Sequence, residues 1–134
     1  MKSILVVGSS NTDMIIRVAR IPRPGETVLG GEFSMAPGGK GANQAVAAAR
    51  AGGRVTLIAR VGDDVFGERA VRNFEADGID VRFVLRDARA ASGVALINVG
   101  ADGENSISVA PGANALLSAE DVRRAGRAFD AADI

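Results

Sequence analysis

Short apolar runs, separated by glycine-rich and polar segments, form the clearest pattern along the chain. Three such runs are Ser3 to Val7, Arg54 to Val61 and Val81 to Leu85. Runs of this length, rich in Val, Ile and Leu, are typical of buried strands in a parallel sheet. We therefore expect these segments to form the strands of a central sheet.

The segments between and after these apolar runs have the pattern of α-helices. The Ala-rich stretch that follows Gly41 ends at Gly52-Gly53, and Ala is the best helix former. A second helix is predicted from Phe66, Ala70 and Phe74, and a third from Val122, Ala125 and Phe129, each set falling on one helix face. Strands alternating with helices predict an α/β fold.

Two acidic positions indicate helix starts. Asp63-Asp64 precedes the second helix, and one of the two is predicted to be its cap, a commoner role than that of a catalytic carboxylate pair. Ser118 to Asp121 has the form of a capping box in which Asp replaces Glu.

A second group of strands has weaker, alternating patterns. Residues 13–19 and 27–35 flank a turn containing two prolines and a glycine, and residues 93–99 and 105–109 flank the hairpin signal Gly100 to Glu104. The first pair forms an excursion from the core, which fits either a lid over a site or a peripheral hairpin.

Composition excludes several classes of function. The 134 residues suffice for one domain, and the 16 basic and 16 acidic residues balance, so nothing directs the chain toward nucleic acid or an anionic membrane. Without His or Cys there can be no Ser-His-Asp triad, thiolate chemistry or ordinary zinc site. The apolar run Ile4 to Val7 is too short for a membrane span. We expect a cytoplasmic protein that binds a small polar molecule.

The segment Gly38-Gly39-Lys40-Gly41 is the first candidate site. Two glycines let the backbone turn sharply and approach a ligand closely, and the helix that follows directs N–H groups at that ligand. Lys40 and Asn43 could add further donors. The alternative is a tight strand-to-helix connection without a ligand. A Walker phosphate loop is excluded, because Ser34 and Gly41 occupy the positions of its first glycine and its hydroxyl.

A polar cluster, Ser9-Ser10-Asn11-Thr12-Asp13, is the second candidate site. It follows the first predicted strand, and ligands of open α/β sheets bind at the carboxyl ends of the strands. A plain turn rich in Asn, Asp and Ser is the alternative.

The sequence stops where a further strand is expected. Asp133-Ile134 follows the third predicted helix, and a sheet of only three core strands would leave an apolar edge. We expect the chain to be part of a longer protein.

With these motifs together, the chain resembles the N-terminal half of the ribokinase-like (phosphofructokinase B-type) carbohydrate kinases. The motifs that carry the resemblance are Val6 to Asp13, Pro24-Gly25-Glu26-Thr27, Gly38 to Ala45, Gly62-Asp63-Asp64 with Gly67, and Pro111 to Asn114. The run Gly39 to Gln44 favours the ribokinase branch over the fructokinases and adenosine kinases. The resemblance implies an α/β fold in which a partial parallel sheet, flanked by helices, carries a small β-lid.

The resemblance also implies site residues. A sugar would be bound by Asn11, Asp13, Gly38, Gly39, Lys40 and Asn43, and Ile107 or Val109 would cover its apolar face. The four strands 13–19, 27–35, 93–99 and 105–109 would form the lid, which in ribokinases also pairs two subunits, so a homodimer is expected.

The catalytic part of such kinases is missing from this chain. The resemblance places the family's aspartate base in a Gly-Ala-Gly-Asp motif, whereas the only Gly-Ala run near the end of this chain, Gly112-Ala113-Asn114, has no Gly-Asp after it. ATP, Mg²⁺ and a monovalent cation are implied by the resemblance, but most of their binding residues would lie outside this chain. No catalytic residue or metal ligand is therefore predicted in it.

The resulting hypothesis is the sugar-binding half of an ATP-dependent kinase that converts D-ribose to ribose 5-phosphate. Two alternatives remain open. One is a non-catalytic module for sugar binding or dimerisation, and the other is a nucleoside or fructose kinase of the same family.

Overall fold

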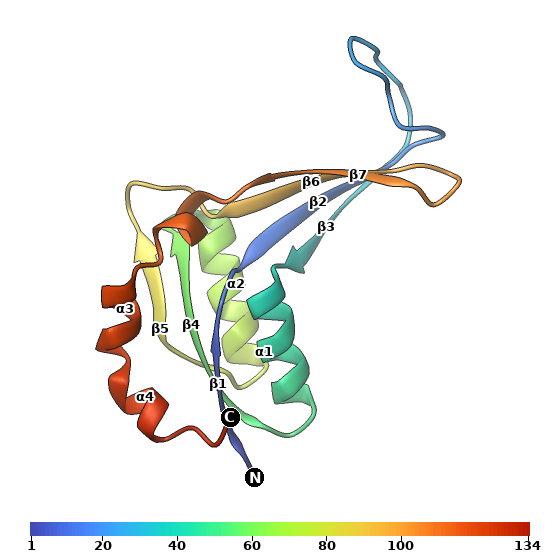
Figure 1. Cartoon of the computed structure of the whole chain (residues 1–134). Helices are drawn as coiled ribbons and strands as arrows, with labels where there is room; N and C mark the ends of the chain where they lie inside the picture. Colours follow the sequence, from blue (N-terminus) through green and yellow to red (C-terminus); the bar gives the residue numbers. More distant parts are fainter.

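A parallel three-stranded sheet forms the core of the computed structural model, which describes residues 1–134 (Figure 1). Its strands are β1 (Ser3–Val7), β4 (Arg54–Gly62) and β5 (Asp80–Asp87), in the order β1-β4-β5. The central strand β4 is almost continuously buried, as expected for a strand with parallel partners on both edges. All three strands fall on the apolar runs from which they were predicted.

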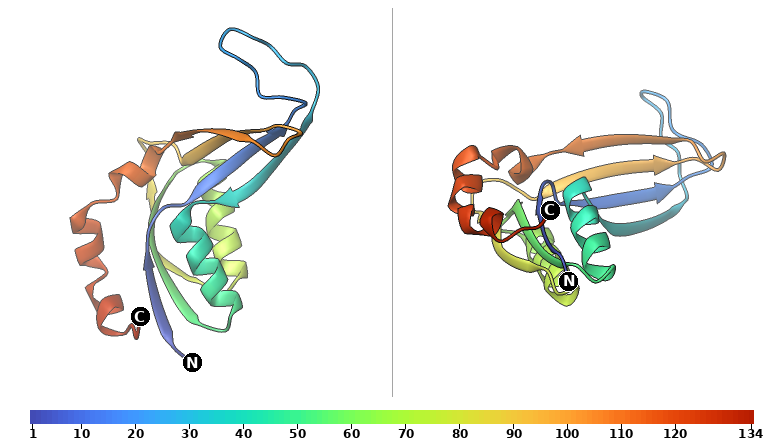
Figure 2. Two further views of the ribbon diagram at one scale, coloured as in Figure 1. Left: turned by 45° about the vertical axis from the view of Figure 1, so that its right-hand side comes forward. Right: turned by 60° about the horizontal axis from the view of Figure 1, so that its bottom comes forward.

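Two helices cover one face of this sheet (Figure 2). They are α1 (Lys40–Arg50) and α2 (Val65–Ala76). The buried side chains of Ala42 and Ala45 bring α1 close to β4, and Phe74 anchors α2 in the same cluster with Leu57. This apolar layer fixes where both helices begin, at the carboxyl end of the core strands.

The opposite face carries η1 (Gly112–Leu116), α3 (Ala119–Arg124) and α4 (Gly126–Asp130). The capping box at Ser118 and Asp121 is confirmed. The prediction of one helix with Val122, Ala125 and Phe129 on one face is wrong: the helix breaks at Ala125, and Phe129 is 46% exposed. Gly126 follows the break, and glycine in a helix interior costs about 1 kcal/mol relative to Ala.

A second, four-stranded sheet, here called the lid sheet, projects from the core (Figure 1). It contains β2 (Asn11–Arg17), β3 (Glu32–Gly38), β6 (Gly93–Val99) and β7 (Asn105–Ala110), in the order β3-β2-β6-β7. The pair β2–β6 is parallel and the other two pairs are antiparallel. The α/β fold with a partial parallel sheet, flanking helices and a small second sheet is thereby confirmed.

The predicted bounds of two lid-sheet strands were wrong at both ends, and β3 spans Glu32–Gly38 where 27–35 was predicted. Strand β2 begins at Asn11 and ends at Arg17, not at 13 and 19, because its pairing with β3 and β6 already starts within the polar cluster, at Asn11. Residues 27–31 are not strand, and Gly30 and Gly31 have φ of 89° and 130°, outside the β region. The predicted turn before them forms, with Glu26 N–H donating to Arg23 O at 3.0 Å.

The last residues of the chain lie along the outer edge of β1. Asp133 N–H donates to Ser3 O at 2.8 Å, and Leu5 N–H donates to Ile134 O at 2.9 Å. None of the helices is both long enough and apolar enough to cross a membrane.

Candidate sugar site on the lid sheet

The two candidate segments meet where β2 leaves the core. Asn11 pairs with Gly38, and Asp13 pairs with Ala36, across the antiparallel β2–β3 ladder. Because side chains alternate along a strand, Asn11 and Asp13 share one face of the lid sheet, next to the glycine turn. The structure therefore brings together the polar cluster and the glycine turn that the sequence analysis singled out separately.

Gly38 allows the closest approach within this site. A Cβ at position 38 would overlap all three carboxyl atoms of Asp13. The missing side chain lets the Asp13 carboxyl group lie directly against the backbone that leads into α1. Gly38 thus determines where the carboxyl group sits.

Gly39 turns the chain into the helix. It is the N-cap of α1 with φ of 95°, in the left-handed region that favours glycine, and a Cβ there would lie 2.8 Å from Ser10 Cα. Ala42 N–H donates to Ser9 O at 2.9 Å, which joins the first turn of α1 to the polar cluster. This N–H group is consequently not available to a ligand.

Lys40 and Asn43 lie on the first turn of α1 and are exposed. Asn43 lines a groove between α1 and α2, together with Arg69 and Asn73. The structure thus places both residues beside the glycine turn, without a hydrogen bond or ion pair from either side chain to Asp13. Their role in binding stays a prediction.

Asp13 is an acceptor without a donor. Its carboxylate takes part in no hydrogen bond or ion pair within the chain, although the residue is only partly exposed. Burial raises the pKa of the Asp13 carboxyl group. A ligand hydroxyl that donated to this carboxylate would replace the lost water.

Asn114 orients Asn11; the sequence analysis named Pro111 to Asn114 as a motif of the resemblance but predicted no site role for Asn114. The Asn114 amide donates to Asn11 Oδ1 at 2.8 Å and to Ser10 O at 3.1 Å, and its own oxygen accepts from Ser10 N–H at 2.9 Å. With its oxygen occupied, Asn11 presents its NH₂ group to a ligand. Only its proximity to a candidate motif could have indicated this role, because 103 positions separate the two residues.

Apolar side chains continue the Asp13 face across the lid sheet. Asp13 pairs with Ala95, which pairs with Val109, and the next row outward is Ile15, Ile97 and Ile107. Ile107 and Val109 are 54% and 55% exposed. Both residues predicted as lid contacts therefore lie on the face that carries Asp13, and Ala95 and Ile97 belong to the same face although the sequence analysis did not name them.

Asp64 has the structural role predicted for one of the two adjacent aspartates. It is the N-cap of α2 and accepts from Gly67 N–H at 2.8 Å, and it also accepts from Ser92 N–H and Oγ at 2.8 and 2.7 Å. Burial would raise the pKa of Asp64, but these hydrogen bonds outweigh it and lower the pKa. Asp63 is exposed, and its carboxylate lies 3.7 Å from the Arg86 guanidinium.

The chain contains no cluster of metal-ligating side chains. No group of three or more acidic side chains lies close enough together to hold a metal ion. Mg²⁺ in proteins is usually held by one or two carboxylates together with substrate phosphates and water.

Sequence comparison decides the family. The family model described as "pfkB family carbohydrate kinase" matches residues 1–134 of this chain. The chain belongs to the pfkB family of carbohydrate kinases.

Among the pfkB relatives, the ribokinase of Bacillus subtilis is 46% identical over 114 residues, which are 85% of this chain and 39% of that protein. The deoxyribokinase of Salmonella typhi is 44% identical over 122 residues, covering 91% of this chain and 40% of that protein. A solved structure of Arabidopsis thaliana ribokinase, complexed with ribose and ATP, superposes with a TM-score of 0.77 at 29% identity, covering 91% and 41% of the two chains. The chain spans about two fifths of the length of these curated relatives.

Proposed function

We propose that this chain forms the sugar-binding part of an ATP-dependent pfkB kinase whose substrate is D-ribose or a closely related pentose, and whose product is the 5-phosphate. We also propose a cytoplasmic location, because the chain has no cysteine and therefore no disulfide of the kind found in oxidising compartments. ATP would be the phosphoryl donor, in keeping with the ribose and ATP complex of the Arabidopsis relative. A role for Mg²⁺ or a monovalent cation would depend on residues outside this chain.

The Asp13 carboxylate carries the proposal. It is a partly buried acceptor without a donor, beside an Asn11 amide whose NH₂ group is directed away from Asn114. A sugar offers neighbouring hydroxyl groups that both donate and accept. Hydrogen bonds to a charged group contribute about 1.5–3 kcal/mol each. Two hydroxyls on Asp13, with one accepting from Asn11, would therefore discriminate strongly against a sugar lacking them.

The lid sheet supports two further parts of the proposal. Ala95 and Val109 lie in the same row as Asp13 and would cover the apolar face of the sugar. The outer row is apolar, and Ile107 in it is 54% exposed, which favours pairing of two copies through the lid sheets. We therefore propose a homodimer. Sedimentation equilibrium measures the molecular mass in solution. We expect a dimer for the parent chain and a monomer for the Ile107→Asp variant.

The relatives named ribokinase and deoxyribokinase point to two different sugars as the substrate. Ribose differs from deoxyribose by one hydroxyl, and the chain is similar to kinases of both names. Kinases for fructose or a nucleoside remain the alternatives within the family. The non-catalytic module is the alternative outside it.

Calorimetric titration of the folded chain tests the proposal, with D-ribose, 2-deoxy-D-ribose, fructose and adenosine as ligands. We expect a pentose to bind best, and binding to disappear in Asp13→Ala but not in the exposed control Asp63→Ala. If Asp13→Ala and the parent chain gave equal heats of sugar binding, Asp13 would not be a binding residue. Transfer of phosphate from ATP to the sugar is measured with the longer protein of which this chain is expected to be part, because the catalytic aspartate is not predicted in this chain. Only a kinase yields the 5-phosphate, whereas a sugar-binding module does not.

A further inference from the structure

The Arg60 side chain joins three elements on the side of the core sheet that carries η1 and α3. Its Nε and Nη2 lie 2.9 and 2.8 Å from Asp87 Oδ2, at the end of β5. Its Nη1 donates to Asp121 Oδ2, in the capping box of α3, at 3.0 Å. The Arg60 side chain is 19% exposed, and those of the two aspartates are 2% and 9% exposed. A largely buried guanidinium therefore links β4 both to β5 and to α3.

One guanidinium faces two carboxylates in this cluster. The Arg89 N–H and then Arg60 lower the pKa of Asp87, and the N–H and hydroxyl of Ser118, together with Arg60, lower the pKa of Asp121. Both carboxylates are therefore charged at neutral pH. Arg60 is the only cation that pairs with either of them. Without it, two buried like charges would lose their common partner, which favours separation of β5 from α3.

Asp87 orders the loop that supports η1. Its Oδ1 accepts from Arg89 N–H at 2.8 Å and from Ala90 N–H at 3.1 Å. The next residue, Ala91, accepts a hydrogen bond from Ala113 N–H of η1 at 2.8 Å. Ala113 is completely buried. The carboxylate of Asp87 thus fixes the backbone on which the start of η1 rests.

Asp121 holds the chain at the other end of η1. Its Oδ2 accepts from the N–H and from the Oγ of Ser118, both at 2.8 Å. Ser118 directly follows Leu117, whose N–H donates to Asn114 O at 3.3 Å and ends η1. Both ends of η1 are consequently held by carboxylates that share Arg60.

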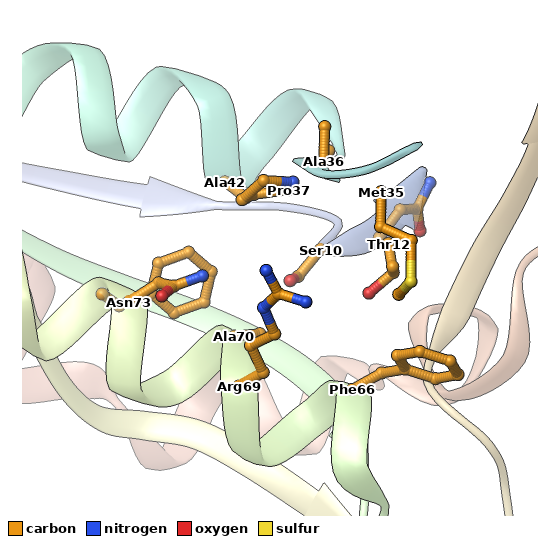
Figure 3. A pocket seen from close by; sticks show the side chains of 13 residues that line it. Ser10, Thr12, Met35, Ala36, Pro37, Ala42, Phe66, Arg69, Ala70 and Asn73 are labelled. Atoms are coloured by element: carbon orange, nitrogen blue, oxygen red, sulfur yellow. The ribbon is translucent and has the colours of Figure 1, made fainter. Parts of the chain in front are cut away.

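Asn114 lies within η1, between these two supports. Its side chain bonds both backbone groups of Ser10 and the side chain of Asn11. Ser10 is only 3% exposed, and Figure 3 shows it beside a small pocket that Thr12 of β2 and Ala42 of α1 also line. A displacement of η1 would therefore change the start of β2, where the candidate sugar site lies.

We propose that Arg60 is a positioning residue for sugar binding. It makes no hydrogen bond or ion pair with Asn11 or Asp13, and it acts by fixing η1 and hence the Asn114 amide that orients Asn11. This inference rests on the proposed sugar site. A merely structural role for Arg60 would lower stability without acting through Asn114, so the two roles can be separated.

A double-mutant cycle makes this separation. Arg60→Lys keeps the charge but lacks the planar fork that reaches both carboxylates. Calorimetric titration of the full chain with D-ribose is expected to show affinity reduced about threefold or more. Arg82→Lys, which alters only an exposed ion pair within β5, should leave affinity unchanged. In the Asn114→Ala background, Arg60→Lys should cause no further loss, because both changes act on the same amide. Additive losses would overturn the proposal.

NMR of the free chain gives a readout that needs no sugar. The side-chain NH₂ signals of Asn11 and Asn114 are expected to shift in Arg60→Lys and in Asp121→Asn, and to stay in place in Arg82→Lys. Asp121→Asn removes one of the two charges that Arg60 joins, and it carries the same cycle if Arg60→Lys does not fold. Unshifted signals in the folded variants would overturn the positioning role. Shifted signals in a chain whose parent binds no ribose would support that role and contradict the proposed function instead.

Discussion

The side-chain amide of Asn114 donates a hydrogen bond to Asn11 Oδ1 at 2.8 Å, although 103 positions separate the two residues. The same side chain bonds both backbone groups of Ser10. Residues at the start of β2 are thereby held by η1, which packs against β4 and β6. The orientation of the Asn11 amide is set from outside its own sheet.

Replacing Asn114 should change sugar binding without touching the sugar. In Asn114→Ala the Asn11 amide is free to rotate, so we expect sugar affinity to fall about tenfold, the worth of one ordinary hydrogen bond. Asn114→Asp keeps the acceptor for Ser10 N–H but offers Asn11 no donor. It should therefore retain more thermal stability than Asn114→Ala while binding equally poorly. Calorimetry and thermal unfolding measure the two effects, and unchanged affinity in both variants would contradict the positioning role.

Gly38→Ala should displace the Asp13 carboxyl group. The added Cβ would overlap that carboxyl group, so Asp13 must move from the glycine turn. We expect sugar affinity to fall by more than about tenfold, since charge-assisted hydrogen bonds depend closely on geometry. Gly126→Ala is the matched control, because nothing lies within 4 Å of a Cβ there and its φ is not positive. Titration of both variants with ribose provides the comparison.

Sugar binding should depend on the protonation of Asp13. Burial raises the pKa of this carboxyl group in the free chain, and only the carboxylate accepts from two hydroxyls. Affinity should therefore increase as the pH rises through that raised pKa and then stay constant. Titrations across the acidic range, repeated with Asp13→Asn, test this expectation. A pH dependence that persists in Asp13→Asn would belong to another group.

The same pKa shift predicts a gain in stability for Asp13→Asn. A carboxyl group with a raised folded-state pKa stabilises the fold only while protonated, so its contribution is lost as the pH rises from about 3.9 through the folded-state pKa. At neutral pH the neutral amide avoids this loss. We expect a higher midpoint of thermal unfolding for Asp13→Asn than for the parent chain, together with weaker sugar binding. A lower midpoint would mean that the carboxylate has a structural partner.

Asp64→Ala and Asp63→Ala form a matched pair for stability. Loss of the Asp64 cap costs about 1 kcal/mol, and leaving Ser92 N–H without its acceptor adds about 1 kcal/mol or more. Asp63→Ala removes only an exposed ion pair and should change stability by less than about 0.5 kcal/mol. The lowered pKa of Asp64 adds a pH test: its contribution is complete above about pH 3.9 and is lost as the pH falls through the folded-state pKa. Urea unfolding measures both variants.

Features with a local physical cause were predictable from the sequence. The apolar runs of β1, β4 and β5 gave the core strands, and the glycines before an Ala-rich run gave the start of α1. Asp64 and Ser118 act as caps because each hydrogen bond closes within three residues. The lid-sheet strand at 27–35 was misplaced because loose alternation does not reveal the positive φ at Gly30 and Gly31.

Relations between distant residues could not be read in the same way. Nothing in the motif Pro111 to Asn114 indicates that Asn114 bonds Ser10 and Asn11. These partners lie more than 100 positions away, and the choice of partner depends on packing that no local pattern encodes. The same limit applies to Phe129, whose helical spacing was right while the helix itself broke before it.

The sequence by itself determined the family, the core strands, the helix starts and the presence of a polar cluster next to a glycine turn, because backbone preference and burial act over a few neighbouring residues. The tertiary structure decided which face of the lid sheet each residue occupies. Register between β2, β3, β6 and β7 places Asp13 with Val109 on one face and Thr12 with Met35 on the other. A shift of one residue would exchange the two faces, and only pairing between strands far apart in the chain fixes that register.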